Sequence, residues 1–442
     1  MRILYLTQWF EPEPHVIKGL RFVRALQAAG HEVTVVTGFP NYPSGRLYPG
    51  YRLKLVQHER IDGVDVVRLP LYPSHDASSL RRSLNYLSFF VSALAYLLIR
   101  RKTFDQAYVY HPPITVGLAA ALAGMMRRLP FILDIQDLWP DTLAAVDMEG
   151  GRRLTRPIGW LCAFVYKRAS AIVAQSEGIR ATLAARGVPA DKLVTIHNWA
   201  NAEPPSVRRQ SSLVPGRFVV VYGGNFGKAQ GLATVLEAAA RLEHQHPDIL
   251  IRLYGDGVEA ASLRAQAQAL DLRNLEIHPQ IGKDEINAVF ARADALLVHL
   301  TDHPLFTITV PSKIQAYLAT GRPIAAGVAG EAARLLVDSG AALVAPPGDA
   351  DALAKIIAAL ADTPADARRR MGLNGRRYYQ RNLAFRRGVH RTLRLLDGTH
   401  RVSRTGSSPA EGSNAGRASA PIRTLGREEF PTRVMRSSSP TP

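Results

Sequence analysis

Cysteine is almost absent from this chain: Cys162 is the only one among 442 residues. A single cysteine cannot form an intramolecular disulfide, which excludes a disulfide-stapled secreted domain and fits a reducing compartment. No two histidines show metal-ligand spacing with a carboxylate partner, so we expect no bound metal. Residues 1–6 enter a strand-like pattern directly, without the architecture of a signal peptide, and this favours the cytoplasm.

The phosphate-binding motifs of common nucleotide enzymes are missing too. No G-x-G-x-x-G follows the first strand, which disfavours a nicotinamide dinucleotide site. Residues 223–229 resemble a P-loop only superficially, because three residues instead of four separate Gly223 from Gly227. Ala229 also replaces the Ser or Thr that would bind magnesium, so we expect neither ATP hydrolysis nor a cofactor. Zinc spacings, RNA-recognition signatures and basic zippers are absent, and nucleic acid is not an expected partner.

Positive charge, by contrast, is abundant. The net charge is +18, and residues 1–200 alone hold 24 Lys and Arg against 15 Asp and Glu. Such an excess suits an anionic membrane surface or an anionic substrate. The length predicts two domains with appendages, and a hydrophobic content of 47% is typical of a globular protein.

Short apolar strands alternate with helical patterns twice along the chain. Seven strand-like runs precede residue 200, and six follow residue 216. This alternation predicts an α/β protein with two Rossmann-like domains, each a parallel sheet covered by helices on both faces. Ligands of such sheets bind at the carboxyl ends of the strands, so we expect both sheets to face a central cleft.

Composition divides the chain into five parts. Residues 1–201 form the N-terminal domain, and the polar residues 202–216, rich in Pro and Ser, form a linker. Residues 217–380 form the C-terminal domain. Residues 381–399 are expected to form a helix that returns to the N-terminal domain. Residues 400–442, rich in Ser, Pro, Gly and Arg, are expected to be a disordered tail.

The segment 81–102 contains the most apolar stretch. Residues 83–99 are 17 uncharged positions flanked by two basic residues on one side and three on the other. Such a helix is about 26 Å long, short for a membrane core of about 30 Å, so a spanning helix is not expected. Two alternatives remain open: a helix lying in the membrane interface with its basic ends on anionic headgroups, or a helix buried against the sheet.

Two stretches of the second half suit a diphosphate. Residues 310–324 predict a helix that begins after a proline and carries Ser312 and Lys313 in its first turn. The alternative is a capped surface helix without a ligand. Residues 223–228 predict a flexible turn rich in backbone amides after a strand, with Lys228 at its end.

In the first half, polar side chains follow two predicted strands. Asp134 and Asp137 lie three positions apart at the end of one strand, and Trp139 offers a stacking face for a sugar. His111 ends the preceding strand in the same way. Carboxylates at strand ends can orient a sugar hydroxyl or accept its proton. Asp141 is better explained as a cap of the next helix.

The chain resembles the glycosyltransferase family 4 enzymes of GT-B fold, especially the bacterial branch that builds O-antigen, capsule and colanic-acid polysaccharides, including transferases for N-acetylfucosamine. The resemblance covers roughly residues 1–395. The matching stretches are residues 30–38, 40–43, 137–140, 222–231, 255–257, 310–317 and 346–349.

This resemblance implies a retaining, metal-independent transferase without a cofactor. The second domain would hold a UDP-sugar, and the first domain a polyprenyl-diphosphate-linked acceptor at the cytoplasmic face of the inner membrane. The sugar would be an N-acetylated deoxyhexosamine or a hexose, and positive charge at the diphosphate would be the main catalytic lever. Two alternatives are a non-catalytic GT-B partner in a polysaccharide assembly complex and a nucleotide-sugar epimerase of the same architecture.

The motifs and the resemblance together assign site residues. The catalytic candidates are Asp137, Lys228 and Lys313. The donor-binding candidates are Gly224, Asn225, Gly227, Gln230, Gly255, Asp256, Pro311, Ser312 and Gln315. The acceptor-binding candidates are Glu13, His111, Asp134 and Trp139.

Four positions depart from the wider family. Its Arg and Lys after the first strand of the second domain fall at Asn225 and Gln230, and a ribose-binding Glu falls at Ala316. The histidine that often precedes the first-domain Asp falls at Gln136. These departures motivate the non-catalytic alternative, whereas the two nearby lysines could supply the missing charge.

Overall fold

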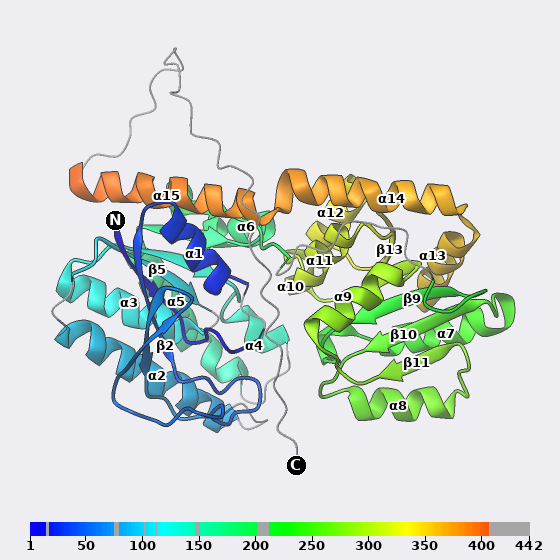
Figure 1. The fold of residues 1–442 in the computed structure, drawn as a ribbon, viewed down its shortest axis with the longest axis horizontal. Coiled ribbons are helices and arrows are strands. Elements are labelled where there is room, and N and C mark those ends of the chain that lie inside the picture. The colour runs from blue at the N-terminus through cyan, green and yellow to red at the C-terminus, as the bar shows by residue number, and fades with distance from the viewer. Residues whose placement is uncertain are drawn as a thin grey trace, which may run out of the picture.

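The computed structural model describes residues 1–14, 17–74, 79–100, 103–111, 113–145, 151–200 and 212–405. These residues form two α/β domains side by side, and two long C-terminal helices run along one edge of both (Figure 1). We call the domain that holds the first sheet the first domain and the domain that holds the second sheet the second domain. The predicted fold with two Rossmann-like domains is confirmed.

The first domain is built on an eight-stranded sheet with the order β3-β4-β2-β1-β5-β6-β7-β8. Its strands are β1 (Arg2–Leu6), β2 (Glu32–Gly38), β3 (Gln57–Ile61), β4 (Val64–Leu69), β5 (Gln106–His111), β6 (Phe131–Ile135), β7 (Ala171–Ala174) and β8 (Leu193–Thr195). All pairs are parallel except β3 with β4. The expectation of a purely parallel sheet is wrong at this edge, because Asp62 and Gly63 have φ angles of 45° and 82° and close a tight antiparallel hairpin.

The second domain has a six-stranded, wholly parallel sheet with the order β11-β10-β9-β12-β13-β14. Its strands are β9 (Phe218–Gly223), β10 (Ile249–Tyr254), β11 (Leu275–His278), β12 (Ala295–His299), β13 (Ile324–Gly327) and β14 (Ala342–Ala345). The strand order reverses direction between β9 and β12. Ligand sites of open α/β sheets form beside such a switch point, at the carboxyl ends of the strands.

Helices cover both faces of the first sheet because its strands are apolar on both sides. In β1, Leu4 and Leu6 belong to one core, whereas Ile3 and Tyr5 belong to the other. The first of these cores packs against α2 (Ser79–Ile99), α3 (Ile114–Arg127), α5 (Gly151–Arg168) and α6 (Glu177–Ala185). The second packs against α1 (Leu20–Ala28) and α15 (Phe385–Thr405).

The second sheet is layered in the same way. In β9, Val220 and Tyr222 face one core, and Val219 and Val221 face the other. The first core packs against α7 (Ala233–Gln245), α8 (Ala260–Ala269) and α13 (Ala350–Asp362). The other face carries α9 (Lys283–Arg292), α11 (Ser312–Thr320), α12 (Gly330–Ser339) and α14 (Ala365–Tyr378). Two short helices, α4 (Asp141–Ala145) and α10 (Pro304–Thr307), lie in loops at the carboxyl ends of the strands.

The C-terminal helices cross from the second domain to the first (Figure 1). Helix α14 ends in the π-helical turn η3 (Tyr379–Leu383), and Ala384 then takes an extended backbone with a ψ angle of 147°. Helix α15 follows and packs on the first domain, where the ring of Phe385 meets the ring of Trp199 edge-on at 5.3 Å. This helix therefore starts at Phe385 instead of residue 381, because the extended residue interrupts it.

Residues 400–405, predicted as the start of a disordered tail, are helical and complete α15. That prediction is wrong there because the end of α15 stays attached to the first sheet, where the side-chain amide of Gln106 donates to the Thr399 hydroxyl at 2.5 Å. The rest of the predicted tail, from residue 406, and residues 202–211 of the predicted linker lie outside the described residues.

Helix α2 is buried against the sheet on one side only, as the buried-helix alternative predicts for that side. One side is buried on the sheet and on α3 through Phe89, Ala93 and Leu97. The opposite side exposes Leu80, Leu84, Leu87, Val91 and Ile99. Among the described residues, α2 is the one helix that is long and apolar enough to cross a membrane. Residues 101 and 102 of the predicted segment lie outside the described part.

Candidate active site

Two loops at the carboxyl ends of β9 and β10 bring most of the predicted donor residues together. The amide of Gly224 donates to the Tyr254 carbonyl at 2.9 Å, and the amide of Phe226 donates to the Asp256 carbonyl at 2.8 Å. The packing is close enough that a Cβ on Gly255 would collide with the Gly224 carbonyl oxygen. The loops after the two strands therefore form one rigid unit.

Lys313 lies across this unit. A Cβ on Gly224, whose φ is +142°, would sit 2.7 Å from the Lys313 Cε and 2.9 Å from its Nζ. In the same unit, a Cβ on Gly257 would sit 2.5 Å from the Asn225 Oδ1. Glycine is needed at both positions because another part of the site occupies the space of a side chain. The fold thus brings Gly224, Gly255 and Lys313, predicted from separate motifs, to one place.

The ammonium of Lys313 is held by an aromatic partner that the sequence did not single out. It donates to the hydroxyl of Tyr222 and lies 3.6 Å from the centroid of the Tyr222 ring. The Tyr222 hydroxyl in turn donates to the Asn225 carbonyl at 2.7 Å. Burial lowers the pKa of Lys313 to about 7. Tyr222 directly precedes the glycine-rich turn, and that position was the only signal available in the sequence.

Residues after the turn hold its shape. The Gln230 Oε1 accepts from the amide of Gly227 at 3.1 Å, so this predicted donor residue closes the turn from within. The Gln230 carbonyl accepts from the Nδ1 of His299 at 2.8 Å, and the amide of Gly348 donates to the Nε2 of the same ring at 3.3 Å. His299 ends β12, and its burial lowers the pKa of its imidazole. His299 was not among the site residues predicted from the sequence.

The remaining donor candidates separate into exposed and buried residues. Ser312 and Lys228 are exposed, as is Asp256, whose carboxylate accepts from the Gly257 amide at 2.8 Å. Gln315 is only 1% exposed. With its amide nitrogen as donor it lies 2.8 Å from the carbonyl of Pro311, which precedes α11. The prediction that Gln315 binds the donor is therefore wrong, because its side chain ties down the start of α11.

In the first domain, Asp137 and Trp139 follow β6 at its carboxyl end. Asp137 is half-buried, and burial raises its pKa to about 6. Its carbonyl accepts from the amide of Trp139 at 3.1 Å. The half-buried indole of Trp139 packs on the first-domain core. Asp141 begins α4 and holds Arg186 with both carboxylate oxygens at 2.7 Å.

Asp134 does not face an acceptor. Its side chain is fully buried, pairs with the equally buried ammonium of Lys18 and accepts from the hydroxyl of Tyr108. Its second oxygen accepts from the amide of Gln136 at 2.6 Å. The predicted acceptor contact is wrong because Asp134 lies within β6, where its side chain points into the domain. A buried carboxylate is tolerated there because both of its oxygens have charged or hydrogen-bonding partners.

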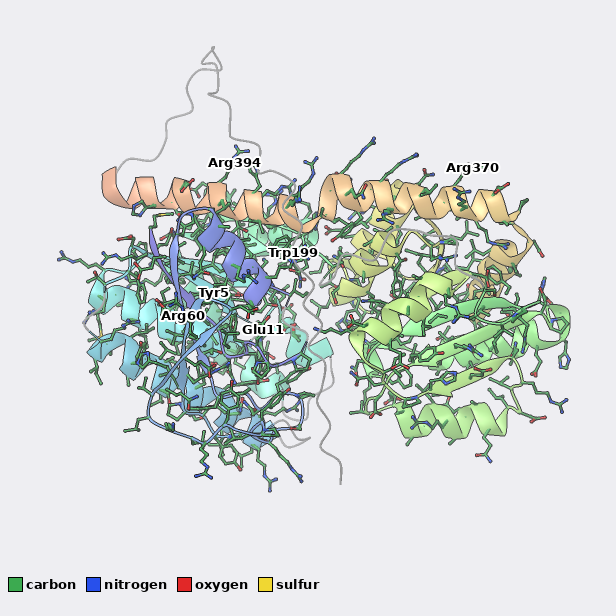
Figure 2. All side chains as sticks on the ribbon, viewed as in Figure 1. Tyr5, Glu11, Arg60, Trp199, Arg370 and Arg394 are labelled. Atoms are coloured by element: carbon green, nitrogen blue, oxygen red, sulfur yellow. The ribbon has the colours of Figure 1, made fainter. Side chains whose placement is uncertain are left out.

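Gln136 also belongs to a second network that the sequence did not predict. The Asn198 side chain donates to the Oε1 atoms of Gln136 at 2.9 Å and Gln175 at 2.8 Å. The three residues follow β6, β7 and β8, so the network ties the carboxyl ends of these strands together. Trp199, which follows Asn198 in the chain, packs beneath α15 (Figure 2).

Glu13 and His111 complete the acceptor candidates. Glu13 is 4% exposed and accepts from the amides of Asn41 at 2.8 Å and Tyr42 at 2.9 Å. Burial raises its pKa to about 7. The prediction of an acceptor contact is wrong for Glu13, because its carboxylate holds two loops of the first domain together. His111 ends β5, and its side chain lies outside the described part of the structure.

Glu11 of the first domain and Lys283 of the second also interact electrostatically. Burial raises the pKa of Glu11, and the ammonium of Lys283 at the start of α9 in the second domain opposes that rise. In Figure 2, Glu11 lies on the side of the first domain nearest the second. No group of three or more His, Cys, Asp or Glu side chains suited to a metal ion occurs within the described ranges.

Two Rossmann-like domains, each with its loops at the carboxyl ends of parallel strands, are the architecture of the GT-B fold. Residues 20–199 match the family model of the glycosyl transferase 4-like domain, and residues 205–378 match that of the glycosyl transferases group 1. The chain belongs to these GT-B glycosyltransferases.

The chain is also similar to a curated relative and to two solved structures. The putative colanic acid biosynthesis glycosyl transferase WcaI of Escherichia coli is 28% identical over 316 residues, which cover 68% of this chain and 76% of the relative. HepE from Anabaena, solved with UDP and glucose, superposes with a TM-score of 0.65 at 17% identity, covering 90% of this chain and 99% of HepE. WaaG, a glycosyltransferase of lipopolysaccharide biosynthesis, gives 0.63 at 15% identity, covering 90% and 100%. At these identities the two solved structures establish the fold.

Proposed function

We propose that the protein is a retaining, metal-independent glycosyltransferase of cell-surface polysaccharide biosynthesis. It would move an N-acetylated deoxyhexosamine or a hexose from a UDP-sugar to a polyprenyl-diphosphate-linked acceptor. The single observation that carries the proposal is Lys313 at the start of α11, packed against the Gly224 turn. The likeness to WcaI supports the polysaccharide assignment, and the UDP bound by HepE supports the donor class.

The donor diphosphate would lie between the Gly224 turn and the first turn of α11. Backbone amides at a helix start and in a glycine turn attract anions. Lys313 would be fully charged once a diphosphate lies beside it, because an anion favours the ammonium that burial disfavours. Lys228, exposed on the other side of the turn, would add a second charge. These cations would stabilise the charge that develops on the departing UDP.

Transfer would proceed on one face of the donor sugar. The bond between the anomeric carbon and the UDP oxygen breaks, and a bond to the acceptor oxygen forms on the same face. The acceptor proton passes to the departing phosphate. Asp137, with a pKa of about 6, would accept a hydrogen bond from a neighbouring hydroxyl of the acceptor sugar and so hold the reacting oxygen toward the anomeric carbon.

The acceptor is proposed to reach the site from a membrane. The exposed side of α2 presents Leu80, Leu84, Leu87 and Val91 at helical spacing, with Arg100 beyond its far end. Such a face suits the interface of a bilayer with anionic lipids. We therefore propose a peripheral location at the cytoplasmic face of the inner membrane. Helix α15, whose Arg394 points away from both domains in Figure 2, covers the opposite face of the first sheet and would face the cytosol.

The decisive experiment combines nucleotide binding with transfer. UDP at 100 times its dissociation constant should raise the unfolding free energy by about 2.7 kcal/mol. A panel of UDP-sugars with a detergent-dispersed polyprenyl-diphosphate-linked sugar should then give a product. Absence of both UDP binding and transfer would contradict the proposal and favour the non-catalytic partner, which the Ala316 departure motivates. Change of the donor sugar without acceptor would indicate an epimerase instead.

A further inference from the structure

The two domains touch at the start of α6. Ser176 precedes this helix; its hydroxyl accepts from the amide of Ile179 at 3.1 Å and donates to the carbonyl of Ile308, in the second domain, at 2.6 Å. The carboxylate of Glu331, in the first turn of α12, accepts from the amides of Glu177 at 2.8 Å and Gly178 at 2.6 Å. A carboxylate of one domain thus satisfies two of the free amides that begin a helix of the other domain.

Two glycines permit close packing here, Gly178 between the domains and Gly330 within the second domain. A Cβ on Gly178 would lie 2.7 Å from the Cβ and 2.8 Å from the Cα of Ile308. A Cβ on Gly330, whose φ is +65°, would collide with the Thr307 carbonyl. The backbone of the second domain therefore approaches α6 more closely than any larger residue at position 178 allows.

Helix α10 adds an apolar component to the same contact. Leu305 is 8% exposed and packs in the core of the first domain, although α10, which carries it, is part of the second domain. Phe306 packs against the cores of both domains, and Ile308 packs against that of the first. The second domain therefore inserts α10 into the first.

This contact is continuous with the proposed active site on both sides. Ile308 precedes Lys313 by five residues, so α10 leads directly into the first turn of α11. On the other side, α10 contacts α4, which follows Asp137 and Trp139. A movement of α10 relative to α6 would therefore change the distance between the ammonium of Lys313 and the carboxylate of Asp137.

We propose that Glu331 is a positioning residue that latches the two domains in the closed arrangement, so that α10 sets Lys313 opposite Asp137. The inference rests on the proposed transferase function for its effect on turnover, but not for its effect on closure. The latch is reversible because water replaces both partners when it opens: the carboxylate and the two amides become solvated. Opening would separate Lys313 from Asp137 and let the glycosylated acceptor leave.

The first test measures closure without any substrate. Cys162 is buried, so labels on Lys54→Cys and Lys355→Cys, at exposed positions in the first and second domains, report the distance between domains. Spin-label distance measurements should give one predominant short distance in the parent protein. In Glu331→Gln the ratio of open to closed molecules should rise about tenfold. Asp338→Asn removes one charge from the exposed side of the same helix and should leave the distribution unchanged.

A second variant, Gly178→Ala, tests the latch without changing a charge. Alanine is the better helix former, so α6 itself should be retained, yet the new methyl group collides with Ile308. This variant should open the domains to a similar extent. Unchanged distance distributions in both variants would overturn the inference.

Kinetics separate a positioning role from a donor-binding role. The loops after β9 and β10, which carry most of the donor candidates, lie within the second domain. Glu331→Gln should therefore leave the Kd for UDP unchanged while it lowers kcat about tenfold. A parallel loss of UDP affinity would overturn the inference, because Glu331 would then belong to the donor site. If the parent protein neither binds UDP nor transfers sugar, the proposed function fails, and the distance measurement still decides the latch.

Discussion

At the scale of single residues, the setting of Lys313 supports its proposed position beside a diphosphate. Its ammonium lies over the Tyr222 ring at 3.6 Å and is short of solvent, so burial lowers its pKa to about 7. An incoming anion replaces the lost solvation and restores the charge. In the proposed function, donor affinity and stabilisation of the departing charge would therefore both depend on the Lys313 Nζ.

Replacing Lys313 with alanine should remove this charge from the departing diphosphate. Loss of one such electrostatic contact costs about 2 kcal/mol or more of transition-state stabilisation, which corresponds to a roughly 30-fold lower kcat/KM. Steady-state transfer assays measure it. Lys355→Ala, at an exposed position of α13, is the control and should have no effect. Full activity of Lys313→Ala would contradict the diphosphate role.

Donor binding should depend on pH through the same group. Below pH 7 Lys313 is already protonated, so a UDP-sugar binds without proton uptake; above pH 7 the protein must take up a proton on binding, and affinity falls as the pH rises. Calorimetry of UDP-glucose at pH 8 in buffers of different ionisation enthalpy should detect this uptake. The variant Lys313→Met should lose it; persistence of the uptake in that variant would assign it to another group.

The buried pair of Lys18 and Asp134 should matter for stability and not for acceptor recognition. Lys18→Met leaves an uncompensated buried carboxylate and should lower the unfolding free energy of the first domain by about 3–5 kcal/mol. The double variant with Asp134→Asn should recover a large part of this loss. Denaturant unfolding followed at the first domain measures both. A stable Asp134→Asn with weakened acceptor binding would restore the original interpretation of Asp134.

At the scale of secondary-structure elements, local patterns were reliable where an element is defined by its own sequence. The predicted alternation of strands and helices in the second half is observed, for example, in β10 (Ile249–Tyr254), β11 (Leu275–His278), α9 (Lys283–Arg292) and β12 (Ala295–His299). The start of α11 was also predictable, because a proline before it and a glycine after it fix its ends. By contrast, the break at Ala384 follows from the change of domain and has no local signal.

The exposed side of α2 should carry membrane binding. Each buried aliphatic side chain contributes about 1.5–3 kcal/mol, so the double variant Leu87→Gln/Val91→Gln should lower affinity for anionic vesicles at least tenfold. Co-sedimentation with vesicles measures the change. Substituting Val258 and Val337, exposed apolar residues of the second domain, is the matched control. Equal binding of the two double variants would contradict the proposed membrane face.

At the scale of the whole molecule, the proposed active site is divided between two domains, and neither domain holds all of its residues. The donor loops and Lys313 belong to the second domain, whereas Asp137 belongs to the first. Glu331 and α10 join the halves, together with the crossing of α14 into α15 (Figure 1). Ligand binding to one domain should therefore change the stability of the other.

UDP should raise the unfolding temperature of both domains in the parent protein, because the latch transmits the stabilisation of the second domain to the first. In Glu331→Gln, UDP should stabilise only the second domain. Calorimetric scans with and without UDP resolve the two transitions. Equal stabilisation of the first domain in both proteins would show that the domains are coupled by another contact.

The sequence by itself determined the α/β class, the alternation of strands and helices, and the motifs of the candidate donor site, because each of these is encoded in a contiguous strand, loop or helix. Only the tertiary structure decided which polar side chains are accessible: Asp134 and Glu13 turned out to be buried. It also decided that Glu331 meets the amide of Glu177, 154 residues away. Local patterns record the conformation of a segment, whereas burial and long-range partners depend on how distant segments pack.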